Sequence, residues 1–449
     1  MVKKDITIIG AGLVGSLLSI YLSKKGYAVN ILERRPDMRK ETILAGRSIN
    51  LALSDRGILA LEEAGVMEQI KPLCIPMHGR FIHKADGTTA FQPYGNKGQF
   101  INSVSRTGLN AKLMDVAEEL GVRISFQKKC HQINWKKKEI ELEDVISHEI
   151  QPVSTGMIFG ADGAFSASRM AHQFNVERFE YSQSFIDFGY KELTIPPGDN
   201  GTFLLEKNAL HIWPRGNYML IALPNIDGSF TCTLFFPYEG EPSFQSINSK
   251  EKVHAFFLET FGDVISLMPF LETEFFENPT SSLVTIKCFP WVYEDVFALI
   301  GDAAHAIVPF FGQGMNCGFE DCAVLNRLID KHSGNWKNIL VEYQDVRKPD
   351  GDAIADLALY NFVEMRDKVG DESFLLQKRI EADFSNKHPD KWIPAYSQVT
   401  FSPGIRYSEA LSSSLKQQQI MNEVMKLDKI ADKWNSPEVE ALMLSLMNV

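Results

Sequence analysis

The 449-residue sequence is poor in cysteine and has no long hydrophobic run. Its six cysteines form neither a C-x-x-C pair nor a cysteine–histidine group at zinc spacing, which argues against a metal site and against a disulfide framework. No export signal precedes the first apolar residues, so we expect reduced thiols in a cytoplasmic protein. Because no apolar stretch reaches about 18 residues, we also expect no membrane-spanning helix.

Positive charge is scarce as well. The sequence holds 46 Lys and Arg residues against 57 Asp and Glu residues, a net charge of −11, which argues against nucleic acid or an anionic membrane as partner. Hydrophobic residues make up 45% of the chain and charged residues 23%, values typical of a globular protein with a sizeable core. At roughly 150 residues per domain, the length predicts two or three structural units.

The N-terminal residues have the order of a nucleotide-binding βαβ unit. A short β-branched run at 6–9 precedes a glycine turn at 10–15, and a helical pattern follows over 16–25. A second apolar run at 28–32 ends at Glu33. Strand, glycine turn, helix, strand and acid in this order predict a parallel sheet that binds a dinucleotide.

Each glycine of the turn has a separate task in such a unit. Gly10 makes the tight turn, Gly12 lets a pyrophosphate approach the backbone, and Gly15 lets helix and strand pack closely. With Leu13 and Val14 they lead into a helix N-terminus, which binds anions through its free N–H groups. Glu33 could then accept hydrogen bonds from a ribose diol. The alternative is a glycine turn in an α/β protein that binds no dinucleotide.

Two later Asp residues follow apolar runs and favour a flavin. The segments are 160–163, which holds an Asp-Gly pair, and 298–306, in which Asp302 could hold a ribityl hydroxyl. The second segment continues into a glycine loop at 309–316 and a helical pattern. A helix N-terminus at this place suits the isoalloxazine ring, which becomes anionic on reduction. A single Asp-Gly pair by itself predicts only a turn.

The middle and the end of the chain differ from this pattern. Between about 184 and 237, apolar runs separated by turn residues predict antiparallel strands inserted into the α/β unit. The run at 296–300 predicts a strand that returns to the first sheet. From about residue 336 onward helical periodicity dominates, with a break near 394–403.

The glycine motif, the Asp-Gly pair and the second Asp with its glycine loop together resemble the single-component FAD-dependent aromatic hydroxylases. Longer stretches resemble the branch of that family that hydroxylates L-kynurenine at ring position 3 in tryptophan degradation and NAD biosynthesis. These stretches are residues 46–57, 210–215, 221–225, 308–316 and 360–366.

The resemblance implies an α/β fold, with a glutathione-reductase-like FAD-binding Rossmann domain, an inserted antiparallel β-sheet and a C-terminal helical domain. It also implies NADPH and O₂ as co-substrates. Because the flavin carries the chemistry, no side chain is assigned as catalytic. The expected FAD-binding domain comprises residues 1–75, 101–178 and 291–335, the substrate-binding sheet domain comprises 76–100 and 179–290, and the helical domain comprises 336–449.

The resemblance also assigns residues to the two sites. An arginine fork that binds a substrate carboxylate matches Arg80, and its tyrosine partner matches Tyr94. The other substrate-pocket residues match Asn361, Tyr396, Leu210, Met219, Phe235, Phe310, Phe311 and Met365, although the apolar ones could equally be ordinary core. Flavin contacts beyond the first glycine turn match Glu33, Arg34, Arg35, Ala52, Arg106, Cys130, Asp302, Gly312, Gly314, Met315 and Asn316.

Several alternatives stay open at this point. Another aromatic hydroxylase or a flavin-dependent halogenase would share the flavin motifs, but the halogenase signature W-x-W-x-I-P is absent, since Pro389 and Lys391 stand at its two Trp positions. A non-catalytic escort of prenylated proteins would need no flavin. The residues after 405 lack the apolar anchor of the eukaryotic hydroxylases, so we expect the soluble, bacterial type. NADPH against NADH and a possible homodimer are not decided by the sequence.

Overall fold

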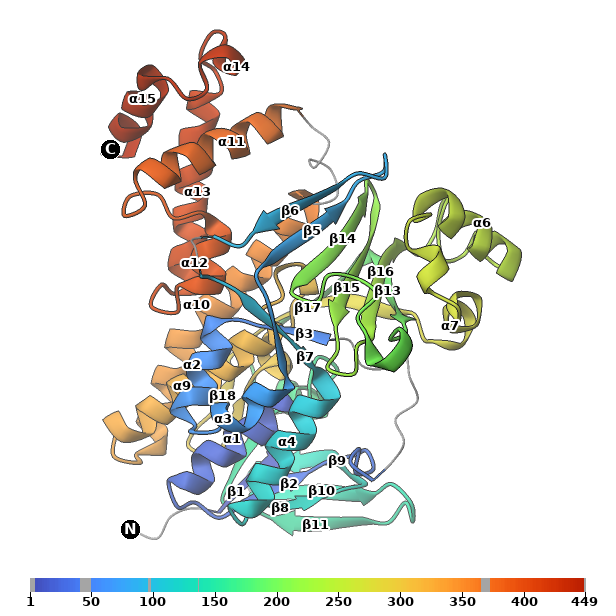
Figure 1. Ribbon diagram of the computed structural model, residues 1–449. Helices are drawn as coiled ribbons and strands as arrows, with labels where there is room; N and C mark the ends of the chain where they lie inside the picture. Colours follow the sequence, from blue (N-terminus) through green and yellow to red (C-terminus); the bar gives the residue numbers. More distant parts are fainter. Residues whose placement is uncertain (1–4, 41–49, 96–97, 136, 365–371, 448–449) are drawn as a thin grey trace.

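The computed structural model describes residues 5–40, 50–95, 98–135, 137–364 and 372–447 (Figure 1). A sheet of six strands lies at one end of the molecule, in the order β18-β19-β12-β1-β2-β8. All pairs in it are parallel except β18 with β19. The strands are β1 (Ile6–Ile9), β2 (Val29–Leu32), β8 (Arg123–Ser125), β12 (Met157–Gly160), β18 (Val292–Tyr293) and β19 (Phe297–Leu299).

The topology places the two nucleotide motifs at one edge of this sheet. Because β1, β2, β12 and β19 run parallel, the segments that follow them leave from the same edge, where open α/β sheets bind ligands. The first glycine turn, Glu33, the Asp-Gly pair at 162–163 and Asp302 therefore converge. The helices α1 (Leu13–Lys24), α4 (Arg106–Glu119) and α9 (Gly314–Lys331) share one core with these strands.

Smaller elements complete this unit, which we call the flavin-side unit because the resemblance predicts that its edge binds the flavin. A three-stranded sheet, β11-β10-β9, shares the same core, and a second one, β3-β7-β4, leads toward the middle of the molecule. Their bounds are β9 (Lys128–Asn134), β10 (Glu139–Asp144), β11 (Ile150–Ser154), β3 (Asn50–Leu53), β7 (Ile101–Ser105) and β4 (Cys74–Met77). The short helices are α2 (Asp55–Glu63), α3 (Met67–Ile70), α5 (Ala167–Asn175) and α8 (Asp302–His305).

The inserted unit is a sheet of seven strands in the order β17-β13-β16-β15-β14-β5-β6. The period of two along its strands separates two cores. Leu220 and Leu234 face α6 (Lys250–Thr260) and α7 (Leu271–Glu277), whereas Met219 and Phe235 face the flavin side. The strands are β5 (Gly79–His83), β6 (Thr89–Pro93), β13 (Glu180–Ile195), β14 (Ala209–Arg215), β15 (Tyr218–Pro224), β16 (Phe230–Pro237) and β17 (Ser281–Phe289).

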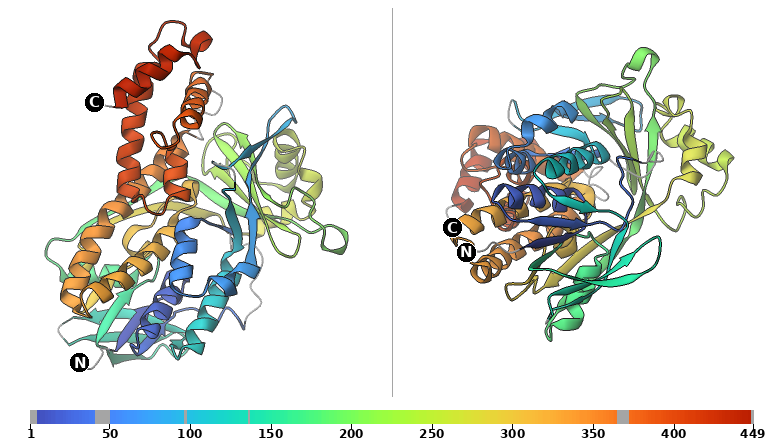
Figure 2. Two further views of the ribbon diagram at one scale, coloured as in Figure 1. Left: turned by 60° about the vertical axis from the view of Figure 1, so that its left-hand side comes forward. Right: turned by 90° about the horizontal axis from the view of Figure 1, so that it is seen from below.

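The C-terminal part is helical and rises from the body of the molecule (Figure 2). Helix α10 (Trp336–Val363) packs along α9, and the later helices build a separate core around Trp392 and Met443. These are α11 (Glu372–Lys387), α13 (Tyr407–Val424), α14 (Ile430–Lys433) and α15 (Pro437–Met447). Helix α12 (Ala395–Phe401) packs instead with the two apolar clusters on the inner side of the seven-stranded sheet. None of the described helices is long and apolar enough to span a bilayer.

One predicted boundary differs from the structure, and one helix start is set by a cap. Helix α4 begins at Arg106, because Ser105 caps it by accepting a hydrogen bond from the Gly108 N–H at 3.2 Å. The expected break at 394–403 contains α12, so the helical periodicity is interrupted there only by short turns. Pro394 and Pro403, which flank this helix of seven residues, led to the prediction of a break.

Candidate functional site

The first glycine turn has two glycines fixed by packing and one that faces open space. A Cβ atom on Gly10, whose φ is +105°, would lie 2.6 Å from the Ala161 carbonyl oxygen, and one on Gly15 would lie 2.0 Å from the Gly10 carbonyl oxygen. A Cβ atom on Gly12 would meet no atom within 4 Å. The free space over Gly12, at the start of α1, fits a pyrophosphate that contacts the backbone.

Glu33 joins the ends of the first two strands. Its carboxylate accepts the Ala11 N–H at 2.8 Å and the Arg35 N–H at 2.9 Å, which holds the glycine turn against the end of β2. A carboxylate has about four lone-pair sites, so it can still accept a ribose hydroxyl. Arg34, Arg35 and Arg106 are exposed, and none forms an ion pair with another residue that the structure describes. They supply positive charge around the turn.

Cys130 and Asp162 are neighbours near the edge of the six-stranded sheet from which the glycine turn leaves. Burial raises the pKa of the Cys130 thiol to about 12, and the charge of Asp162 adds to the effect, so the thiol stays protonated. Asp162 accepts hydrogen bonds from the Ser166 and Ser168 hydroxyls at 2.5 and 2.6 Å. The Asp-Gly pair therefore fixes the start of α5.

The segment from Gly301 to Gly318, which contains the second glycine loop (residues 309–316), lies against helix α1. A Cβ atom on Gly301, whose φ is +61°, would lie 3.0 Å from Val14, and one on Gly318 would lie 2.5 Å from Val14. Val14 thus fills the space between α8 and α9. The Asp302 carboxylate lies 4.0 Å from where a Gly314 Cβ would stand, so an acid and a helix N-terminus face the same space. This pairing fits the ribityl and pyrimidine parts of a flavin.

Asn316 holds the second loop to β3. Its Oδ1 accepts the Ser54 N–H at 3.0 Å, and its Nδ2 donates to the carbonyl oxygens of Ala52 and Gly312 at 2.9 Å each. Its side chain is therefore engaged within the protein, and a direct contact with a flavin stays a prediction. The neighbouring Met315 is buried in the flavin-side core.

Arg80 is clamped between two tyrosine rings. Its guanidinium carbon lies 4.4 Å from the ring centre of Tyr396 and 5.3 Å from that of Tyr94. No carboxylate of the described residues pairs with it. Tyr94 is 3% exposed, and its hydroxyl has no hydrogen-bond partner among the described residues. Burial raises the pKa of Tyr94 well above its usual value, so the phenol keeps its proton.

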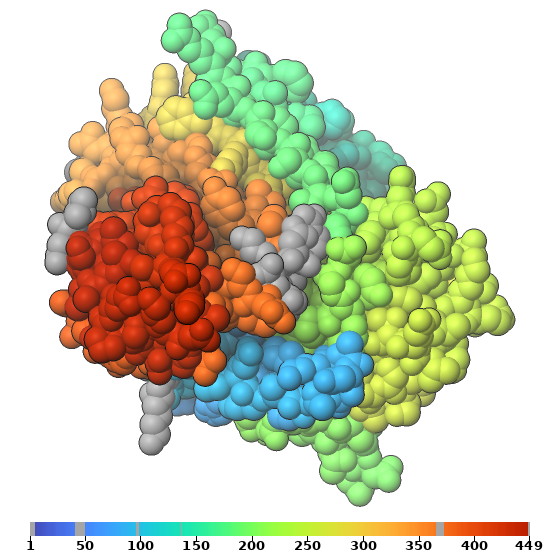
Figure 3. All heavy atoms as spheres, turned by 90° about the horizontal axis from the view of Figure 1, so that it is seen from above, coloured from blue at the N-terminus to red at the C-terminus, as the bar shows by residue number. Residues whose placement is uncertain are grey.

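Apolar side chains from three parts of the chain surround this clamp. Phe310 packs on Phe235 with ring centres 5.2 Å apart, and Phe311 stacks on Tyr396 at 5.7 Å. Met219 lies opposite Phe235 on the neighbouring strand, and Leu210 packs in the cluster that holds Tyr94. Figure 3 shows β5 and β6 (blue) beside the C-terminal helical part (red and orange) on one face of the molecule.

Two further residues, Asn361 and Met365, were predicted to line the substrate pocket. Asn361 on α10 donates from Nδ2 to the Phe310 carbonyl oxygen at 2.6 Å, which fixes one wall of the aromatic group. Met365 lies outside the described residues. Tyr396 belongs to both apolar clusters, so the described pocket residues meet where the sheet, the second loop and α12 join.

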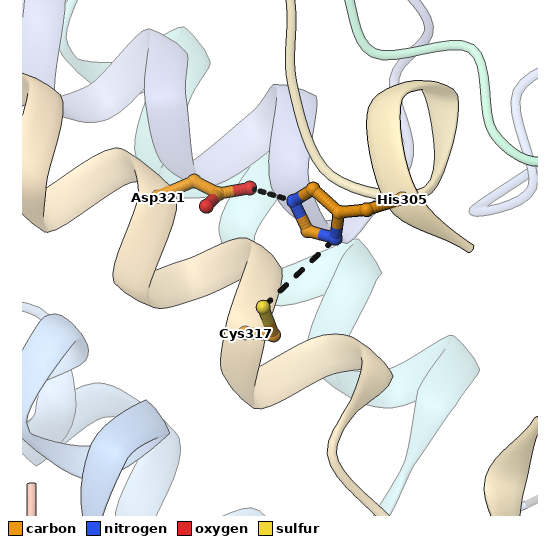
Figure 4. A group of neighbouring side chains, drawn as sticks. All are labelled: His305, Cys317 and Asp321. Atoms are coloured by element: carbon orange, nitrogen blue, oxygen red, sulfur yellow. Dashed lines mark hydrogen bonds and ion pairs between the residues drawn. The ribbon is translucent and has the colours of Figure 1, made fainter. Parts of the chain in front are cut away.

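Beneath the second loop lies a buried ionic group that the sequence did not reveal (Figure 4). His305 Nε2 lies 2.7 Å from Asp321, and its Nδ1 lies 3.9 Å from the Cys317 sulfur. Asp321 also accepts the Gly301 N–H at 3.1 Å and the Arg347 Nε–H at 2.7 Å. Although burial opposes it, Asp321 raises the pKa of His305 well above its usual value, which favours the imidazolium form.

This group has the ligand types of a metal site but the charges of an ion-pair network. The same Arg347 guanidinium donates to the Cys317 sulfur at 3.3 Å, so a cation at the centre would meet a fixed positive charge. Asp321 and Arg347 stand in no motif, and they join His305 only in space, because Asp321 pairs with both His305 and Arg347. Their role is to hold Gly301 and the second loop in place.

Comparison with known proteins defines the class first. The family model "FAD binding domain" matches residues 3–358. A 2-methyl-3-hydroxypyridine-5-carboxylic acid oxygenase has the same fold, with a TM-score of 0.67 at 18% identity over 82% of this chain and 94% of its own. A tetracycline destructase follows, with a TM-score of 0.62 at 17% identity over 89% and 98%. The fold is that of the FAD-dependent monooxygenases.

Full-length relatives are more specific. A kynurenine 3-monooxygenase of Flavobacterium johnsoniae is 53% identical over 442 residues, 98% of each chain. Those of Flavobacterium psychrophilum and Dictyostelium discoideum are 51% and 44% identical, over 99% of this chain and 99% and 97% of their own. The chain belongs to the kynurenine 3-monooxygenase family. The predicted fold class, the flavoprotein class and the monooxygenase activity are thereby confirmed, and the halogenase alternative is not favoured.

Proposed function

We propose that this chain hydroxylates L-kynurenine at ring position 3, with NADPH and O₂ as co-substrates, through the site that surrounds Arg80. The observation that carries the proposal is a guanidinium without a carboxylate partner beside a buried phenol without a hydrogen-bond partner. Relatives named for this reaction, at 41–53% identity over most of the chain, support it.

The clamp has the chemistry to bind the substrate's amino-acid carboxylate. Arg80 offers a planar fork of N–H donors that matches the two oxygens of a carboxylate. Tyr94 is protonated and can add a third donor. A buried polar group without a partner costs free energy, so a bound carboxylate would relieve that cost for the Tyr94 hydroxyl.

The apolar walls suit the aromatic ring of the substrate. Met219, Phe235 and Phe310 form a continuous apolar surface on the flavin side of the seven-stranded sheet. Such a surface excludes water and orients the ring by packing. With the carboxylate held at Arg80, a ring lying between these side chains is directed toward the second glycine loop.

The two loops fit FAD. Gly12 and Glu33 would bind its pyrophosphate and ribose, and Asp302 with the N–H groups at Gly314 would bind its ribityl chain and ring. When bound, FAD would supply the redox chemistry: electron uptake from NADPH and transfer of one oxygen atom of O₂ to the substrate. The protein contributes orientation, exclusion of water and the electrostatic setting of the second loop. A homodimer and a cytoplasmic location stay predictions.

The test compares an enzyme variant with a substrate analogue. Arg80→Met removes the fork, and losing a charge-assisted contact typically costs about 2–5 kcal/mol, so the kynurenine Kd should rise roughly thirtyfold or more. FAD content and the visible spectrum should stay near wild type. A kynurenine analogue without its carboxylate should bind the wild type weakly and lose little further affinity in Arg80→Met.

The control is Arg379→Met, which removes another arginine stacked on an aromatic ring, 3.9 Å from the centre of Trp434. It should leave both affinities unchanged. The assignment is wrong if kynurenine and its analogue differ as much in Arg80→Met as in the wild type.

A further inference from the structure

Arg56 is the centre of a contact between the flavin-side unit and the C-terminal helices. It lies on α2, its side chain is fully enclosed, and its guanidinium stacks on Tyr407 with 4.0 Å to the ring centre. Its Nη1 donates to Glu320 on α9 at 2.9 Å. It belongs to a stretch that resembles the hydroxylase family, yet neither the flavin nor the substrate assignment uses it.

The remaining donors of Arg56 bind backbone carbonyl groups around the end of α12. Nε donates to Val399 at 2.7 Å, and Nη2 lies 3.2 Å from the Gln398 oxygen and 3.3 Å from the Ser402 oxygen. Nη2 also donates to the Ile405 carbonyl oxygen. The last carbonyl groups of a helix have no partner within the helix and carry partial negative charge, so one guanidinium satisfies the end of α12.

Helix α12 carries one of the two clamp tyrosines and a ring that packs against the other. Tyr396 contacts Arg80 and stacks on Phe311, and Phe401 packs against Tyr94 with ring centres 6.1 Å apart. Because α12 has only seven residues, a shift of its C-terminal end moves Tyr396 as well. The position of the Tyr396 ring over Arg80 therefore depends on the hydrogen bonds from Arg56 to the end of α12.

The other side of Arg56 leads to the second glycine loop. Glu320, which pairs with Arg56, also accepts the Arg347 Nη1–H at 2.6 Å, and Arg347 binds Asp321 beneath Gly301. In addition, the Tyr407 hydroxyl donates to Gln313 of the loop at 2.9 Å. A continuous set of buried and partly buried polar contacts thus joins α12 to the loop assigned to the flavin.

We propose that Arg56 is a positioning residue for substrate binding: it holds α12 so that Tyr396 closes over Arg80, and it ties this closed clamp to the second glycine loop. The inference rests on the proposed function, since it takes Arg80 to bind the substrate carboxylate. Among the described residues, Arg56 contacts none of those assigned to the substrate or the cofactor. It therefore acts through α12.

Lysine cannot replace Arg56 in this role. Its ammonium is a compact point charge, whereas the planar guanidinium stacks on Tyr407 and reaches Glu320 and several carbonyl groups at once. Arg56→Lys keeps the positive charge beside Glu320 and so separates charge from geometry. A matched control is Arg327→Lys, because Arg327 pairs with Glu63 at 2.7 Å and joins the same two helices, α9 and α2, at an exposed place.

The experiment measures two dissociation constants for each FAD-loaded enzyme, that of kynurenine and that of the analogue without a carboxylate. In Arg56→Lys the kynurenine Kd should rise at least tenfold. The ratio of the analogue Kd to the kynurenine Kd should fall toward one. FAD content should stay near wild type, and peroxide released per NADPH consumed should increase. Arg327→Lys should match the wild type in all four quantities.

A second variant guards against misfolding. Arg56→Ala, purified with ethylguanidinium present to fill the space of the missing side chain, should regain the wild-type ratio and lose it when the ethylguanidinium is removed. A role in stability alone would lower the melting temperature but leave the ratio unchanged, which would overturn the proposal. Loss of FAD that ethylguanidinium does not restore would overturn it too, because Arg56 would then serve the cofactor unit.

These outcomes are distinct from a failure of the proposed function. If Arg80 does not bind the carboxylate, Arg80→Met leaves the ratio of the two constants unchanged. If Arg80 does bind it but Arg56 has no positioning role, Arg80→Met lowers the ratio and Arg56→Lys does not.

Discussion

At the scale of single residues, the charge of the nearest neighbour decides whether the pKa of a buried histidine is lowered or raised. His172 and His305 are 0% and 3% exposed. Burial lowers the pKa of His172 to about 4, because its only polar contact among the described residues is the Pro290 carbonyl oxygen. The neighbouring Asp321 reverses this effect at His305. One histidine is therefore a neutral core residue, and the other is a cation under the second loop.

The difference predicts how stability depends on pH. Between its ordinary pKa of about 6.5 and its folded value of about 4, His172 binds a proton only in the unfolded chain, so stability falls as the pH is lowered through this window. His172→Phe should remove about 3 kcal/mol of this loss, measured by urea unfolding between pH 7 and pH 4. His131→Phe, at an exposed position, is the control. Parallel pH curves for wild type and His172→Phe would contradict the assignment.

At the scale of elements, the first glycine turn combines two different demands. Gly10 and Gly15 are glycines because a Cβ atom would collide with backbone oxygen atoms, whereas Gly12 is free of such contacts. Packing of β1 on α1 explains the outer glycines. No contact among the described residues accounts for the middle one, which is the glycine assigned to the pyrophosphate.

Substitutions should separate these demands. Gly12→Val should fold with the melting temperature of the wild-type apoprotein but bind no FAD, because the valine occupies the space of the pyrophosphate. Gly15→Val should lose stability even without FAD, because its Cβ would lie 2.0 Å from the Gly10 oxygen. Absorbance of purified protein and thermal unfolding of the apoproteins measure the two effects. A full complement of FAD in Gly12→Val would show that the cofactor lies elsewhere.

At the scale of the whole molecule, the chain has several hydrophobic cores. The flavin-side core, the outer core of the seven-stranded sheet and the core around Trp392 share no buried residues. Arg56 binds the end of α12, and Arg406 at the start of α13 donates to Asp350 on α10, so these two residues connect the later helices to the rest of the molecule. The C-terminal core should therefore lose its structure without release of the cofactor.

Met443→Asp tests this independence. The side chain is 0% exposed in the C-terminal core, so an unpaired carboxylate there should destabilise the local helices by several kcal/mol. Hydrogen exchange should rise in α11, α13 and α15, while FAD content stays near wild type. Leu415→Asp, at a 49% exposed position on α13, should change neither. Loss of FAD from Met443→Asp alone would mean that the two parts unfold together.

The parts of the site that are close in sequence were predictable. Gly10 and Gly15 follow from a local turn, and Asp302 follows its strand directly, so spacing alone placed them at a ligand edge. Arg80 could be assigned only through family resemblance, because a single arginine has no local signature. Asp321 and Arg347 were missed, since their partners lie on other elements and no spacing along the chain relates them.

The sequence by itself determined the parallel sheet, the position of the dinucleotide turn and the inserted antiparallel strands, because these depend on residue periods and turn chemistry over short stretches. Only the tertiary structure decided that Arg80 lies between Tyr94 and Tyr396 and that Phe311 stacks on Tyr396. These residues come from separate elements, and packing of the sheet, the second loop and α12 brings them together. Long-range packing energy, which no local pattern encodes, selects that arrangement.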